Sequence, residues 1–197
     1  MRQMNMDELR EGIDLGRAVI EDNLMDMYIT KKLLANEGFP EEDLDGFIAQ
    51  KVREYEERYA AMEDEEFMAS LTEEWERPAE DPDGTEDLEA NARAIDKELT
   101  RLAYIEDPED PEFVEINPIA ILQGLINVMD LQIGKVIRVK RALALAGVDP
   151  EEVAMAIADT AKEFDERYMK MSVTEIEETM FRRMAEIDEI VRSHPKG

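Results

Sequence analysis

The sequence predicts an all-α protein built from a duplicated helical-bundle unit, and three observations lead to this fold class. First, residues 38–62 and 147–171 align without a gap at an offset of 109, with 9 of 25 positions identical. Second, aromatic residues make up only 6% of the chain, a composition that favours helices over a β-sandwich. Third, apolar residues recur at helical spacing along most of the chain.

The repeated segment determines the expected architecture, because self-similarity at a fixed offset indicates a repeated structural unit. The identical pairs are Gly38/Gly147, Glu42/Glu151, Ile48/Ile157, Ala49/Ala158, Glu54/Glu163, Glu57/Glu166, Arg58/Arg167, Tyr59/Tyr168 and Met62/Met171. One unit of about 70 residues is marginal for an independent core. We therefore expect the two units to pack their apolar faces together about a pseudo-twofold axis.

The first repeat, residues 1–76, is predicted to contain three helices and to be acidic. The first helix covers about 7–36 and ends before Gly38, since glycine readily supplies the left-handed residue at a helix C-terminus. The second runs over about 41–62, and the third carries apolar residues at steps of four. Those residues are Phe67, Leu71 and Trp75.

The middle of the chain, residues 77–117, is predicted to be a linker helix between acidic, proline-containing connectors. Residues 77–84 are rich in Pro, Gly and charge, which indicates a loop. A helix follows from Thr85 to about residue 102. Residues 106–112 contain two prolines and five acids, so we expect an extended connector.

The second repeat, residues 118–197, carries clear helix-start signals. Asn117-Pro118 and Asp149-Pro150 each place proline at a first helical position. Ser172 and Glu175 have the spacing of a capping box. Pro40 stands where the second repeat has Asp149, so this cap is not shared. The whole chain then has about seven helices.

Charge is distributed unevenly over a chain whose net charge is −27. Residues 1–116 hold 36 acidic and 12 basic side chains, whereas residues 117–197 hold 14 and 11. This charge repels nucleic acid and anionic membranes and attracts basic proteins. No signal peptide is visible at the N-terminus, so we expect a cytoplasmic protein or a virion component. Polar residues interrupt 118–139, which we interpret as a buried helix and not a membrane span.

The residues of common active sites are missing from the chain. There is no cysteine, and the single histidine, His194, lies in the C-terminal tail. No phosphate-binding glycine loop or nucleophile elbow is present. Two short acidic segments fail the calcium-loop pattern, because Val52 and Ala90 stand where the last ligand is required. We therefore predict a non-enzymatic protein without a cofactor.

A dense basic cluster is the candidate partner-binding site. It consists of Lys135, Arg138, Lys140 and Arg141. These cations either complement the C-terminal end of their helix or dock an acidic surface, and the sequence leaves both interpretations open. The repeated Glu57-Arg58-Tyr59 segment and its copy Glu166-Arg167-Tyr168 are interpreted as packing elements, with tyrosine rings facing inward.

Three functions are compatible with these features. The leading hypothesis is a helical protein–protein interaction or assembly subunit of a larger complex, for example a viral or phage structural or assembly factor, which binds protein partners or copies of itself. An acidic DNA mimic that inhibits a nucleic-acid-binding protein is the second. A carboxylate metal-binding bundle is the third.

Overall fold

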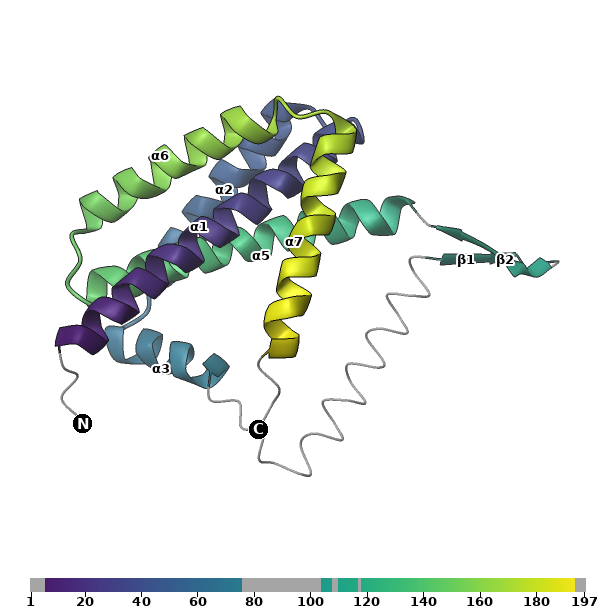
Figure 1. Cartoon of the computed structure of the whole chain (residues 1–197). Helices are drawn as coiled ribbons and strands as arrows, with labels where there is room; N and C mark the ends of the chain where they lie inside the picture. Colours follow the sequence, from purple (N-terminus) through teal and green to yellow (C-terminus); the bar gives the residue numbers. More distant parts are fainter. Residues whose placement is uncertain (1–5, 76–103, 108–109, 117, 194–197) are drawn as a thin grey trace. The chain divides into compact units, whose positions relative to one another are not determined.

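The computed structural model describes residues 6–75, 104–107, 110–116 and 118–193, and helices dominate it (Figure 1). The helical class predicted from the sequence is confirmed, with six helices in the described residues. The elements are α1 (Met6–Asn36), α2 (Glu41–Ala60), α3 (Asp64–Trp75), β1 (Tyr104–Asp107), β2 (Asp110–Ile116), α5 (Pro118–Leu145), α6 (Pro150–Tyr168) and α7 (Val173–Ser193). The helix predicted over 85–102 lies outside the described residues.

The chain divides into two compact units that do not follow the predicted repeat boundaries. The large unit comprises Met1–Ala61 and Val128–Gly197, and the small unit comprises Met62–Asn127. Helix α5 begins in the small unit and continues into the large one. The division of the sequence at residues 76 and 117 therefore stays a prediction.

Helix boundaries recur at the 109-residue offset found in the sequence. Helices α1 and α5 end at Asn36 and Leu145, α2 and α6 begin at Glu41 and Pro150, and α3 and α7 begin at Asp64 and Val173. We call two residues 109 positions apart counterparts. The same offset thus relates three pairs of helix ends, two of which lie outside the aligned segments.

The turns after α1 and α5 have the same geometry. Gly38 and Gly147 have φ angles of 96° and 89°, in the left-handed region that glycine adopts readily. The Gly38 N–H donates to the Ala35 carbonyl at 3.1 Å, and the next N–H donates back to Leu34 at 3.1 Å. The corresponding bonds after α5 are both 3.0 Å. These are Schellman motifs, as expected for glycine after a helix.

The predicted difference in capping between α2 and α6 is also present. The Asp149 carboxylate accepts a hydrogen bond from the Glu151 N–H at 2.9 Å, whereas Pro40 offers no side-chain cap. The predicted capping box of α7 is formed, since the Ser172 N–H donates to Glu175 at 2.8 Å and the Glu175 N–H donates to the Ser172 hydroxyl at 3.3 Å.

In the large unit, α1 packs against α6, α7 and α2 (Figure 1). Helices α1 and α6 run in the same direction, because Arg17 pairs with Glu152 and Lys31, further along α1, pairs with Asp165, further along α6. Helices α2 and α5 are joined in the same way. The buried core includes five counterpart pairs: Ile20/Met129, Leu24/Ile133, Met27/Val136, Leu34/Leu143 and Leu44/Val153.

The small unit contains an antiparallel hairpin in the segment predicted to be an extended connector. Tyr104 pairs with Ile116, and Glu106 pairs with Val114. Both strands contain aromatic and β-branched residues, which favour strand structure. The prediction recognised that proline prevents a helix here but missed the strand pairing, because pairing depends on both arms of the hairpin.

Helix α5 is the one described helix that is long and apolar enough to cross a membrane, judged by length and composition. A core helix of a soluble protein passes the same test. Seven of its residues are buried in the protein, all of them from Met129 onward, including the polar Gln132. By contrast, Ile119, Ile121 and Leu131 are exposed, so only part of the helix predicted to be buried lies in the core.

Candidate functional site

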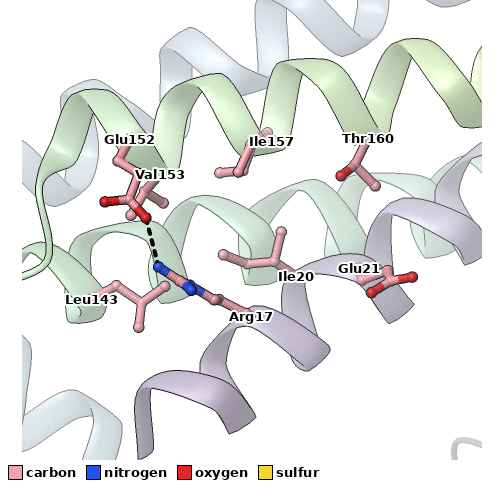
Figure 2. A pocket seen from close by; sticks show the side chains of 9 residues that line it. Arg17, Ile20, Glu21, Leu143, Glu152, Val153, Ile157 and Thr160 are labelled. Carbon is pink, nitrogen blue, oxygen red and sulfur yellow. Dashed lines mark hydrogen bonds and ion pairs between the residues drawn. The ribbon is translucent and has the colours of Figure 1, made fainter. Parts of the chain in front are cut away.

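A pocket of about 240 Å³ lies between α1 and α6 in the large unit, and Figure 2 shows its lining. Its apolar walls are formed by side chains from α1, α5 and α6. These are Ile20, Leu143, Val153, Ala156 and Ile157. Helices α1 and α6 lie side by side. Residues spaced about one helical turn apart along each helix therefore face the same pocket.

The polar lining of this pocket consists of two carboxylates, one guanidinium and one hydroxyl group. Arg17 on α1 donates to Glu152 on α6 at 2.8 Å, and the dashed line in Figure 2 marks this pair. The two side chains are 53% and 59% exposed, so the pair contributes little to stability. Glu21 lines the pocket as well and has no ion-pair partner among the residues the structure describes. One guanidinium therefore stands against two carboxylates.

The residues at the 109-residue offset from this lining lie on α5, α2 and α1, and we call them the counterpart site. Its apolar residues match those of the pocket. The matched pairs are Ile20/Met129, Leu143/Leu34, Val153/Leu44 and Ile157/Ile48. The carboxylate of Glu21 is matched by that of Asp130. Two counterpart positions differ strongly in size, because Phe47 corresponds to Ala156 and Lys51 corresponds to Thr160. A third differs in charge, since Arg17 corresponds to the apolar Ile126.

In the counterpart site, the larger side chains supply an aromatic ring and a cation. Lys51 Nζ lies 3.6 Å from the Asp130 carboxylate and 3.0 Å from that of Glu54. It also lies 5.8 Å from the centroid of the Phe47 ring, within cation–π range. The hydrogen bond to Glu54, and the charge of Asp130 after it, raise the pKa of Lys51. Ala156 and Thr160 cannot make such interactions, which leaves the hollow beside α6 open.

The four basic residues predicted to bind a partner do not form one face. Lys135 is exposed, whereas Arg138 and Arg141 are partly buried and each takes part in an interaction. Lys140 donates to Glu56 on α2 at 2.6 Å. At 3.6 residues per turn, Lys140 points about 140° away from Lys135. Lys140 and Arg141 border a second cavity of about 370 Å³. Their role as a docking patch stays a prediction.

A buried lysine is the feature that sequence reasoning missed. Lys31 is 1% exposed, and its ammonium donates to Asp45 and Asp165 at 2.6 Å each. Burial lowers the pKa of Lys31, but the two hydrogen bonds outweigh it and leave the pKa raised. The sequence repeat contained a signal for this ion pair. Lys31 and Lys140 are counterparts, as are Glu56 and Asp165, so a lysine and an acid recur together in both copies.

A second group of charges joins α7 to α1. Arg183 lies 2.9 Å from Asp22 and 3.3 Å from Asp26. Burial raises the pKa of Asp26 above its ordinary value, and the charge of Arg183 opposes this shift. These ion pairs tie α7 to α1.

The repeated tyrosines face the packed side of their helices. The Tyr55 and Tyr59 rings stack at 5.9 Å, and the counterpart rings of Phe164 and Tyr168 lie 5.6 Å apart. Tyr168 is 1% exposed. This arrangement agrees with the packing role expected for the repeated segment.

No group of three or more acidic or histidine side chains in the described ranges is arranged to hold a metal ion. No family model, curated protein or solved structure matches the chain. The fold and the pocket define the class as a helical protein with an acidic, apolar-lined hollow on its surface.

Proposed function

We propose that this chain is a non-enzymatic interaction subunit of a larger complex, built from two copies of one helical unit. The recurrence of helix ends at one offset supports the duplication. So does the reciprocal pairing of charges, in which Lys31 binds Asp165 and its counterpart Lys140 binds Glu56. In a bundle with a pseudo-twofold axis, each such bond has a partner related by that axis.

The observation that carries the interaction function is the pocket between α1 and α6. An apolar hollow beside paired and unpaired carboxylates suits a protein partner that presents apolar and basic side chains together. The chain's net charge of −27 steers such a partner toward it and repels acidic ones. The partner can also be a second copy of the chain. In that homo-oligomer, an acidic surface of one subunit binds a basic surface of the next.

Isolation and reconstitution test the function. The tagged full-length chain is purified from its own cells at low ionic strength, and proteins that accompany it are identified. The purified partner is then mixed with the purified chain, and Kd is measured at low and high salt. We expect a basic partner, or a second copy of the chain, whose affinity falls at high salt because exposed charges are screened.

Matched charge variants locate the interaction. Glu21→Gln with Glu152→Gln should weaken partner binding, whereas Glu163→Gln, at an exposed position of α6 outside the pocket, should not. Light scattering at both salt concentrations reports self-association. A chain that stays monomeric and binds no protein after reconstitution overturns the proposed function.

The charge asymmetry favours one alternative function, a DNA mimic. Residues 1–116 carry 36 of the 50 acidic side chains, as expected for a surface that replaces a phosphate backbone. Such a protein competes with DNA for its partner. If the reconstituted partner binds DNA and the chain displaces that DNA, the alternative is favoured over a simple assembly role.

A further inference from the structure

The two counterpart sites differ in charge at Arg17, whose counterpart is Ile126, and in size at two further positions that point to a ligand. The site between α5 and α2 contains an aromatic ring, from Phe47, and a cation, from Lys51, next to the Asp130 carboxylate. The pocket between α1 and α6 keeps the apolar walls and the carboxylate but has Ala156 and Thr160 at those two positions. The open pocket therefore has the apolar walls and the carboxylate that surround Phe47 and Lys51 in the counterpart site, but it has no aromatic ring or ammonium group at those two positions.

We propose that the pocket between α1 and α6 binds an aromatic side chain together with a neighbouring lysine or arginine of the partner protein. This inference rests on the proposed function and names the chemistry that the partner presents. The ring enters the apolar hollow between Ile20 and Ile157, where Figure 2 shows both side chains. The cation lies near Glu21, as Lys51 lies near Asp130 in the counterpart site.

Charge supports a basic occupant of this pocket. Arg17 is the one cation in the lining, and it already binds Glu152 at 2.8 Å. An acidic ligand would meet the Glu21 carboxylate and the negative field of the chain. An uncharged aromatic ligand would fill the apolar hollow but leave Glu21 unpaired.

Small molecules that carry the same two groups test the proposal on the full-length chain. The probe is 3-phenylpropylamine, followed by methyl NMR signals of Ile20, Ala156, Ile157 and Thr160. Matched controls are 3-phenylpropanol, which lacks the charge, 3-phenylpropionate, which reverses it, and propylamine, which lacks the ring. We expect weak, saturable shifts at these methyls with the amine probe, smaller shifts with the alcohol, and none with the other two controls.

Two pocket variants and one control variant separate binding from folding. Ala156→Phe installs the counterpart residue Phe47 and should fill the pocket, abolishing probe binding without loss of thermal stability. Ala158→Phe, at an exposed position of the same helix, should bind the probe normally. Glu21→Gln should weaken the amine by up to about fivefold, as expected for an exposed ion pair, and leave the alcohol unchanged.

Several outcomes overturn the inference. These are the absence of shifts at the pocket methyls up to the solubility limit, equal binding of amine and propionate, or full binding by a folded Ala156→Phe variant. If Ala156→Phe fails to fold, Thr160→Lys replaces it, since its ammonium should occupy the cation position and exclude the amine. A natural partner that binds folded Ala156→Phe normally removes this inference but leaves the proposed function standing.

Discussion

The ammonium of Lys31 lies 2.6 Å from the carboxylate of Asp165, a residue 134 positions further along the chain. This bond joins the C-terminal part of α1 to that of α6. Its counterpart, from Lys140 to Glu56, joins α5 to α2 at the same distance. An ion pair thus links the helices of each parallel pair, beside the apolar core that they share.

Replacing Lys31 by Met should destabilise the protein, because Asp45 and Asp165 lose the cation between them. Loss of one partner of a buried pair costs about 3–5 kcal/mol. The two carboxylates are 60% and 41% exposed, so water compensates part of this loss. We therefore expect a decrease of about 1–3 kcal/mol in the free energy of unfolding, measured with urea.

Lys140→Met is the matched control for this lysine. Lys140 makes one ion pair and is 28% exposed, so its replacement should cost about 0–1 kcal/mol. Equal losses in the two variants would contradict the conclusion that burial and the second carboxylate make Lys31 the stronger tie.

Gly134→Ala should destabilise the contact between α5 and α2. A Cβ at this position would lie 2.8 Å from Cζ of Tyr55, so the ring must move. Such overpacking costs about 1–3 kcal/mol, and the better helix propensity of alanine returns up to about 1 kcal/mol of that. Urea unfolding of the variant measures the net loss.

Gly46→Ala is the control for this substitution, because nothing lies within 4 Å of a Cβ there. It should stabilise α2 by about 0.5–1 kcal/mol. The double variant Gly134→Ala with Tyr55→Leu should recover part of the loss. A Gly134→Ala protein more stable than the original would show that the ring does not occupy this position.

The two Schellman turns should respond alike to substitution. Gly38→Ala and Gly147→Ala each force a Cβ into the left-handed region, at a cost of about 1–2 kcal/mol. Neither position has a neighbour within 4 Å of the added carbon, so the backbone strain alone should decide the result. Thermal unfolding of both variants measures it, and a turn that tolerates alanine without loss would refute the shared geometry.

The pKa of Asp26 should lie above its ordinary value of 3.8 in a carbon-detected NMR titration of the carboxyl group. Burial is the main cause. Because the folded state then holds this proton more tightly than the unfolded state, the contribution to stability is present below pH 3.8 and is lost as the pH rises through the folded-state pKa. Arg183→Met should raise the Asp26 pKa further, since it removes the opposing charge. A titration at or below 3.8 would contradict the assignment.

Glu175 should titrate in the opposite direction, below its ordinary value of 4.5. The Ser172 N–H and hydroxyl both donate to this carboxylate, which lowers its pKa. The contribution of the capping box to stability is therefore present above pH 4.5 and is lost as the pH falls through the folded-state pKa. Ser172→Ala should raise the Glu175 pKa toward its ordinary value and leave Asp26 unchanged.

The helices and their ends could be predicted because their causes are local. Gly38, Gly147 and the Ser172 capping box act through the backbone of adjacent residues, and each has the predicted geometry. The hairpin between Tyr104 and Ile116 was missed, since strand pairing requires two segments to meet. No local pattern in the sequence distinguishes Lys31 from a surface lysine, because its burial depends on α6 lying beside α1.

The candidate site could be predicted only in part for the same reason. The sequence drew attention to the cluster from Lys135 to Arg141, which is dense along the chain but turns around the helix in space. No sequence pattern marks Ala156 and Thr160 as site residues, because small residues on a helix are common. Only their comparison with Phe47 and Lys51 gives them meaning.

The sequence by itself determined the helical class, the main helix starts and stops, and the acidic character, because these depend on residues close together in the chain or on composition. The tertiary structure alone decided which lysine is buried and where a pocket opens. Both depend on α6 lying along α1, more than 100 residues away in the chain, so that hollows and ion pairs arise from side chains no local pattern brings together.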